Sequence, residues 1–225
     1  MCAATVMIAR LAGSIGRDWA SALYVLFGYY LSGRLFLVPS PRMERWLAAW
    51  DRRLFGDPTT RFQGWPRWLL SYLDVVYLGC FLLVPGGFAA LAWTGHAAQA
   101  DRFWTMVSAA EFGAFAPLAL VQTRPPWAIE RAHELRDRGI HRVASALVRH
   151  GTIGANTFPS GHVAGSLAVA FAVIGAVPWI GALLLVLAFS ISIGCVVGRY
   201  HYSVDVAAGA ALALAIWAIV AASGI

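Results

Sequence analysis

The chain has 225 residues, of which 60% are hydrophobic and only 12% are charged. Soluble domains usually carry about 25% charged residues, so this chain has too few polar groups to cover a water-facing surface. The net charge of +6 comes from arginine alone, because the sequence contains no lysine. These arginines fall in loops between apolar segments, which excludes a nucleic-acid partner and favours anionic lipid headgroups.

Six segments are candidates for membrane-spanning helices. A helix needs about 20 mostly apolar residues to cross a bilayer core of about 30 Å. The predicted fold class is therefore all-α, a polytopic membrane bundle with spans near 19–38, 68–93, 103–123, 163–177, 179–197 and 205–225. Pro85-Gly86-Gly87 predicts a kink or break in the second span. Pro178-Trp179 predicts a tight hairpin between the fourth and fifth spans.

Two long loops separate these spans. Residues 39–67 are rich in arginine and tryptophan, which predicts an amphipathic helix in the membrane interface. Residues 125–160 hold a second helical stretch, in which Ile140 and Leu147 are spaced like one helical face and Glu134 can pair with Arg138. We interpret both as surface helices covering the bundle. The expected division is an N-terminal anchor span with its interfacial helix, residues 1–67, and a membrane core, residues 68–225.

The arginines are distributed unevenly between the two faces of a six-span bundle. Loops 39–67, 124–161 and 199–204 share one face and hold 13 arginines, against three on the opposite face. The positive-inside rule places the arginine-rich face in the cytoplasm of a cell such as a bacterium, with the bundle in its plasma membrane. Arginines that serve a site or a surface helix inflate this count, so the sidedness stays open.

Every strong motif lies on this arginine-rich face. Arg124-Pro125-Pro126 closes the third span, Pro159-Ser160-Gly161-His162 opens the fourth, and the run from Arg199 to Asp205 opens the sixth. Three spans therefore present ionisable groups at one membrane depth, where such groups are costly and usually functional.

His201 and Asp205 are one helical turn apart, so they face the same way. A carboxylate beside an imidazole fixes the tautomer and leaves the other ring nitrogen free to act as a nucleophile. His162 follows Ser160-Gly161 at a helix N-terminus, where an anion is stabilised and a general acid can act on it. Taken alone, each motif is also explained by an ordinary helix cap.

Arg124 and Arg199 add forked donors that match phosphate oxygens. Either arginine alone is also explained by a side chain that reaches the interface. Together with the two histidines, the aspartate and the helix N-terminus, they predict phosphoryl transfer. A metal site formed by His162, His201 and Asp205 is the competing interpretation, but nearby arginines would repel a cation. We therefore expect neither a metal nor a cofactor.

The ordered motifs resemble the type 2 phosphatidic acid phosphatase superfamily over roughly the second to sixth spans. This resemblance implies a six-helix, metal-free membrane phosphatase or phosphotransferase whose catalytic core is residues 68–225. It implies that His201 attacks phosphorus and forms a phosphohistidine, that Asp205 orients His201, and that His162 protonates the leaving group. It also implies that the phosphate is bound by Arg124, Arg199, Ser160 and Gly161.

The chain departs from that family in two motifs. Pro117 occupies the position of the family's lysine, and Gly194 and Cys195 occupy the positions of its Ser-Arg pair. Arg199, two residues before His201, is a candidate replacement for the missing arginine. In both departures the chain resembles a different branch of that superfamily, which includes the inositol phosphorylceramide and sphingomyelin synthases.

The stretch Leu73-Asp74-x-x-Tyr77 is also similar to that branch. It makes Asp74 a candidate contact for a substrate hydroxyl. A buried carboxylate bonded to a neighbouring helix is the simpler explanation of Asp74, and equally of Glu111 in the third span.

Three functions remain open. The first is hydrolysis or transfer of a phosphoryl group on a lipid or polyprenyl phosphate that enters from the membrane. The second is transfer of a phosphorylated headgroup, such as inositol phosphate, onto a lipid alcohol. The third is a non-catalytic transporter or lipid-binding scaffold with a degenerate site. Release of inorganic phosphate separates the first two, and labelling of His201 by substrate separates both from the third.

Overall fold

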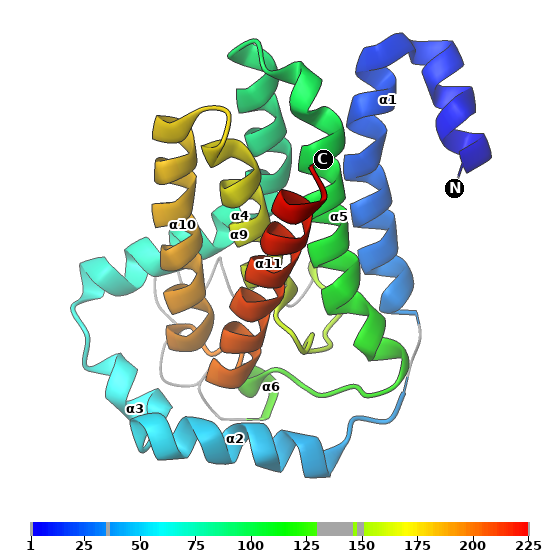
Figure 1. The fold of residues 1–225 in the computed structure, drawn as a ribbon. Coiled ribbons are helices and arrows are strands. Elements are labelled where there is room, and N and C mark those ends of the chain that lie inside the picture. Colours follow the sequence, from blue (N-terminus) through cyan, green and yellow to red (C-terminus); the bar gives the residue numbers. More distant parts are fainter. Residues whose placement is uncertain (1, 35–36, 130–145, 148–150, 225) are drawn as a thin grey trace.

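The computed structural model describes residues 2–34, 37–129, 146–147 and 151–224, and this part of the chain is all-helical (Figure 1). The long helices form a bundle, and α2 lies across one end of it. The bundle helices are α1 (Cys2–Ser32), α4 (Arg67–Trp93), α5 (Ala100–Phe115), α9 (Gly161–Ile174), α10 (Pro178–Val197) and α11 (Ser203–Ser223). The shorter elements are α2 (Pro41–Phe55), α3 (Pro58–Gln63), η1 (Ala97–Gln99), η2 (Ala116–Ala119) and α6 (Pro126–Ile129).

Within the described residues, three helices are long and apolar enough to cross a membrane, namely α4, α10 and α11. They agree within two residues with predicted spans 68–93, 179–197 and 205–225. Large apolar side chains such as Leu82, Leu183 and Ile219 are exposed on them. An exposed apolar surface of this extent indicates a membrane protein, because water would not stabilise it.

The other three predicted spans are shorter in the structure or have different ends. The helix α1 ends at Ser32, six residues before the expected end at Val38. The helix α5 ends at Phe115 and continues as the 3-10 helix η2, in which Pro117 is near the start. The third, α9, is a shorter apolar helix of 14 residues. The six-span architecture therefore stays a prediction.

The helix α9 is at the centre of the bundle, packed against α4, α5, α10 and α11. Most of its residues are buried, and many are glycine or alanine, which lets neighbouring helices approach closely. At 1.5 Å per residue it is about 21 Å long, shorter than a bilayer core of about 30 Å. A short helix is accommodated because protein surrounds it, and its N-terminus with His162 is thereby enclosed by the bundle.

Of the kink or break predicted at Pro85-Gly86-Gly87, the break does not occur, since α4 runs continuously from Arg67 to Trp93. Proline is tolerated within membrane helices where neighbouring segments support the backbone. The neighbour here is α9, which approaches so closely that a Cβ at Gly87 would overlap Val169. The predicted hairpin at Pro178 is confirmed: α9 ends at Ile174 and α10 begins at Pro178, and the two helices pack together.

The predicted helix within residues 39–67 is confirmed as α2, which Ser40 caps by accepting a hydrogen bond from the Met43 N–H. Its arginines at 42, 45, 52 and 53 are exposed. Its opposite face buries Glu44, Leu47 and Asp51 against the bundle. Most of the second predicted helical stretch, including Ile140 and the Glu134–Arg138 pair, lies outside the described residues; Leu147 is described and is exposed.

Candidate active site

The starts of α9 and α11 lie against each other, which brings the second and third motifs together. The backbone N–H of Ser160 donates to the carbonyl of Asp205 at 3.0 Å. Gly209 permits this approach, because a Cβ there would lie 2.6 Å from the Ser160 carbonyl oxygen. Residues about 40 positions apart in sequence thus share one corner of the bundle.

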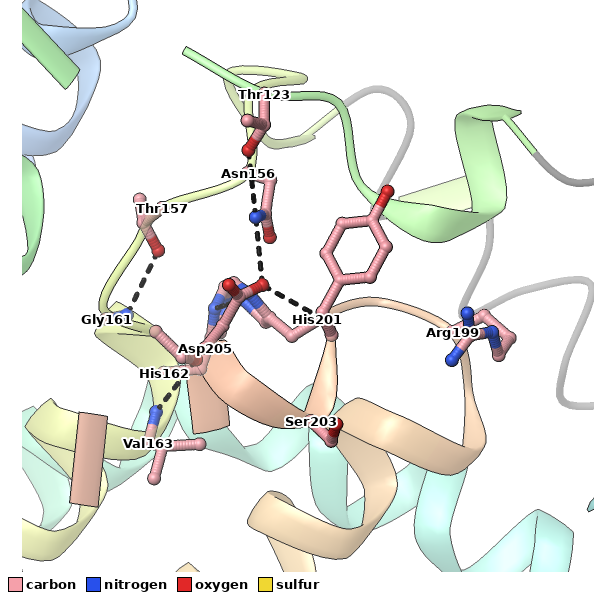
Figure 2. A network of polar contacts seen from close by, with 12 residues as sticks. Thr123, Asn156, Thr157, Gly161, His162, Val163, Arg199, His201, Ser203 and Asp205 are labelled. Atoms are coloured by element: carbon pink, nitrogen blue, oxygen red, sulfur yellow. Dashed lines mark hydrogen bonds and ion pairs between the residues drawn. The ribbon is translucent and has the colours of Figure 1, made fainter. Parts of the chain in front are cut away.

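Within this corner, Asp205, His201 and His162 form a chain of polar contacts (Figure 2). The Nδ1 atom of His201 lies 3.6 Å from Asp205 Oδ2. The Nε2 atom of His201 lies 3.2 Å from His162 Nδ1. The first distance is slightly too long for a hydrogen bond, as is common in catalytic pairs that tighten when substrate binds. The geometry is that of an acid–base relay with His201 at its centre.

Asp205 is completely buried and has two further partners. Its Oδ2 accepts hydrogen bonds from the Tyr202 N–H at 3.0 Å and from Asn156 Nδ2 at 2.9 Å. Asn156 Nδ2 also donates to Thr123 Oγ1 at 3.1 Å, which ties in the segment before Arg124. Asp205 therefore caps α11 and faces His201 at the same time, so the two interpretations of the His–Asp pair are compatible.

The same geometry argues against a metal bound by His162, His201 and Asp205. Asp205 faces Nδ1 of the His201 ring, whereas His162 faces Nε2 on the other side. The three side chains are therefore arranged in a row and do not converge on one point, as ligands of a single ion must.

The His162 ring is held by aromatic side chains of α4. Tyr77 lies 5.3 Å and Phe81 5.6 Å from it, measured between ring centroids. Tyr77 in turn stacks on Tyr200, with centroids 3.9 Å apart, and the Tyr200 hydroxyl donates to Asp74 Oδ1 at 3.4 Å. Asp74 is buried, so the structure places it behind the histidines as a carboxylate that anchors Tyr200.

Ser160 and Gly161 form the N-terminus of α9. The Ser160 hydroxyl accepts from the Val163 N–H at 3.5 Å, and Thr157 Oγ1 accepts from the Gly161 N–H at 3.1 Å. Ser160 is thus the N-cap of α9, the ordinary role that the sequence left open. The positive end of the α9 dipole remains directed at the corner occupied by His162.

Arg124 is held by Glu44 of α2. Its Nε and Nη2 atoms donate to the two carboxylate oxygens at 2.9 and 2.8 Å, and its backbone N–H donates to Oε1 at 2.9 Å. These hydrogen bonds hold the pKa of Glu44 below its ordinary value. The Arg124 side chain is still 51% exposed, so part of its guanidinium faces outward.

Arg199 is held by a second carboxylate of α2. Its Nη1 atom lies 2.7 Å from Asp51 Oδ2, and both side chains are almost completely buried, at 4% and 1% exposure. Asp51 Oδ1 also accepts from the N–H and the hydroxyl of Ser203 at 2.9 and 2.6 Å. Arg199 has a φ of +61°, uncommon for a residue other than glycine. It lies apart from the histidine cluster in Figure 2.

The sequence did not single out Glu44, Asp51 or Asn156. Glu44 and Asp51 are seven residues apart and therefore share one face of α2. Two carboxylates at this spacing in an arginine-rich helix were a usable signal that one face meets cationic partners. Asn156 had no such signal, because its role depends on the fold of the segment before α9.

A family model described as the PAP2 superfamily matches residues 45–219, well over half of the chain. The chain belongs to the PAP2 superfamily. The comparisons with curated proteins and with solved structures give no match. PAP2 members are phosphatases, which supports an enzyme with phosphatase- or phosphotransferase-type activity on a phosphorylated substrate. Both histidines and the aspartate are present and lie next to one another, which argues against a non-catalytic scaffold with a degenerate site.

Proposed function

We propose that this chain is an integral membrane phosphohydrolase or phosphotransferase that acts on a lipid or polyprenyl phosphate through a phosphohistidine at His201. The observation that carries the proposal is the row Asp205–His201–His162 at the enclosed N-terminus of α9. A nucleophile, its orienting carboxylate and a second histidine are in contact, and the surrounding helices are apolar enough to take the substrate from a membrane.

The reaction has two steps. In the first, the lone pair of His201 Nε2 attacks phosphorus and the bond from phosphorus to the lipid oxygen breaks, while His162 donates a proton to that oxygen. In the second, a water attacks the phosphohistidine, His162 takes the water's proton, and inorganic phosphate leaves. Asp205 holds the Nδ1–H tautomer of His201 throughout, so that Nε2 carries the lone pair.

Substrate binding has to separate the two histidines. Attack requires phosphorus about 3–3.5 Å from Nε2, and the leaving oxygen has to lie about 2.6–3.2 Å from the acid. The present separation of 3.2 Å between Nε2 and His162 Nδ1 has no room for that group.

The phosphate oxygens are bound by Arg124, Arg199, Ser160 and Gly161 in this proposal. Glu44 and Asp51 now hold the two guanidinium groups, so phosphate binding requires each arginine to exchange a carboxylate for a phosphate oxygen. Arg124 does this more readily, because its side chain is half exposed. The N-terminus of α9 adds a positive dipole end. Its Gly161 and Val163 N–H groups, now bonded to Thr157 and Ser160, likewise have to exchange these partners for phosphate oxygens.

Headgroup transfer to an alcohol is the second candidate. It is favoured by the replaced family positions: Pro117 lies in the 3-10 helix η2, and Cys195 is buried with its carbonyl accepting from the N–H groups of Tyr200 and His201. Neither position offers a cation, so the phosphate site differs from the pattern of the lipid phosphatases. Under this candidate, the phosphohistidine carries the phosphorylated headgroup, and a lipid alcohol replaces water in the second step. Asp74 is then the proposed contact for its hydroxyl group.

We further propose six spans, with α1, α5 and α9 joining the three long apolar helices in a bacterial plasma membrane. The α1 side chains Leu23, Leu26 and Phe27 are exposed, as expected in lipid. The exposed arginines of α2 suit anionic headgroups. Their number favours the cytoplasmic face. A reporter fused after Ile225 tests this sidedness, because α11 runs from the end of the bundle near α2 towards the opposite end (Figure 1).

The activity is tested with purified protein in detergent and EDTA, by measuring phosphate release from diacyl, monoacyl and polyprenyl phosphates. We expect release that vanadate inhibits and that His201→Ala abolishes. His96→Ala is the matched control, because His96 lies between α4 and α5 at the far end of the bundle. If release is absent, a lipid that carries a phosphorylated headgroup, such as phosphoinositol, supplied together with a lipid alcohol tests transfer. Full activity of His201→Ala would contradict the proposal.

A further inference from the structure

A cavity of about 520 Å³ lies between α1, α4, α5 and α9 and reaches His162. This volume is within the range of about 300–1,000 Å³ typical of ligand sites. Most of its wall is apolar. The side chains of Leu23, Leu26 and Phe81, which line it, are also exposed on the outside of the bundle. The cavity therefore connects the lipid-facing surface between α1 and α4 with the general acid.

Among the described residues that line this cavity, the one carboxyl group belongs to Glu111 on α5. It lies against the first two turns of α9: a Cβ on Gly165 would overlap Oε1, and a Cβ on Gly161 would lie 3.3 Å from Oε2. The two glycines thus make the space that this carboxyl group occupies. Within the described residues, Glu111 has no hydrogen bond or ion pair.

A carboxyl group without a partner in an apolar wall is costly, and a ligand that supplies a hydrogen-bond donor removes that cost. Three other polar groups of the wall already have partners. The Tyr29 hydroxyl accepts from the Ile153 N–H at 3.1 Å, the Tyr30 hydroxyl donates to the Gly151 carbonyl at 3.0 Å, and Thr157 accepts from Gly161. Ser166 also lines the cavity, but its hydroxyl both donates and accepts, so the carboxyl group of Glu111 is the stronger acceptor for a donor on the ligand.

The position of His162 identifies which part of the substrate enters. The general acid acts on the oxygen that leaves phosphorus, and in a lipid phosphate this oxygen carries the hydrocarbon chain. A cavity whose inner end contains His162 therefore receives the leaving alcohol. The Glu111 carboxyl group faces Gly161 and Gly165, one residue before and three residues after His162 on α9, so it is near the first carbons next to the leaving oxygen.

We propose that this cavity binds the chain of a lipid phosphate that carries a free hydroxyl group next to its phosphate ester, and that Glu111 accepts the hydrogen bond of this hydroxyl. The assignment rests on the proposed function and adds the substrate class. The proposed site distinguishes lipids that carry a hydroxyl group on the carbon beside the phosphate ester from lipids in which this carbon is acylated or carries only hydrogen.

The test compares 1-oleoylglycerol 3-phosphate with its 2-deoxy analogue, which differs by one hydroxyl group. We expect kcat/KM of the wild-type protein to be about 10-fold or more higher for the hydroxyl lipid. Glu111→Leu should abolish this preference, and Glu111→Gln should keep part of it, since its amide oxygen still accepts. Asp101→Asn, a carboxylate change on the exposed start of α5, is the matched control and should keep the full preference.

Binding of the non-hydrolysable phosphonate analogues of both lipids gives a second readout that needs no turnover. If the wild-type protein hydrolyses neither lipid but binds the hydroxyl phosphonate more tightly in a manner dependent on Glu111, the proposed reaction fails and the lipid site stands. A preference that persists unchanged in folded Glu111→Leu protein, or that the wild type lacks in both assays, overturns the site. Gel filtration of each variant establishes that it is folded.

Discussion

Replacing Asp51 by alanine removes the carboxylate that faces the Arg199 guanidinium at 2.7 Å. Both side chains are almost fully buried, and removal of one partner from a buried ion pair costs about 3–5 kcal/mol. The hydrogen bonds from Ser203 to Asp51 are lost as well. We expect Asp51→Ala to lower the free energy of unfolding by about this amount, measured by SDS-induced unfolding in detergent.

A double variant separates a charge effect from a general loss of packing. In Asp51→Leu/Arg199→Met the pair is replaced by apolar side chains, a change that is often neutral or stabilising by about 1–4 kcal/mol. We expect this variant to be clearly more stable than Asp51→Ala. Arg52→Ala, on the exposed face of α2, is the control and should change stability by no more than about 1 kcal/mol. An equally small change in Asp51→Ala would refute a buried pair at this position.

The same double variant tests the role of Arg199. If its guanidinium exchanges Asp51 for a phosphate oxygen, Asp51→Leu/Arg199→Met stays at least about 10-fold less active than the wild type although its stability has recovered. Recovery of kcat/KM together with stability would remove Arg199 from the phosphate site and leave it a structural role in the turn before His201.

Two further predictions concern the acid and the pH range. His162→Asn should lower the rate of phosphohistidine formation about 100- to 10,000-fold with a lipid phosphate and much less with p-nitrophenyl phosphate, whose leaving group needs no proton; equal losses in this first step would show that His162 is not the general acid. Because Arg124 lowers the pKa of Glu44 in the folded protein, their pair stabilises the protein above the ordinary glutamate pKa of about 4.3, and this contribution is lost as the pH falls through the lowered value. Unfolding measured between pH 3 and pH 7 should show this acid loss in the wild type and a weaker one in Glu44→Gln; identical profiles would contradict it.

The sequence predicted the long apolar helices well because lipid-length apolar runs determine them directly. The start and end of α4, α10 and α11 follow from this signal within two residues. The signal fails for α9, whose length is set by the helices around it, and for the end of α5, where Pro117 lies near the start of a 3-10 turn. The continuity of α4 at Pro85 depends likewise on packing that local propensity does not contain.

The central residues of the site were also predictable, because His201 and Asp205 are one turn apart and the motif that ends in His162 opens a helix. Their contact across 39 positions depends on the close approach of Ser160 and Gly209, which no local pattern specifies. The arginines show the limit most clearly. Arg124 and Arg199 were assigned to phosphate from their chemistry, whereas the structure pairs them with Glu44 and Asp51 of a helix distant in sequence.

The most direct test of the central proposal is rapid-quench labelling of the purified protein with a lipid phosphate radiolabelled in its phosphoryl group, in the presence of EDTA. A phosphohistidine mechanism predicts a protein-bound label that is stable in alkali and labile in acid, that maps to His201, and that is absent in His201→Ala. It also predicts that the label decays as inorganic phosphate or as a phosphorylated alcohol appears. Turnover by His201→Ala, or a label on a different residue, would contradict it.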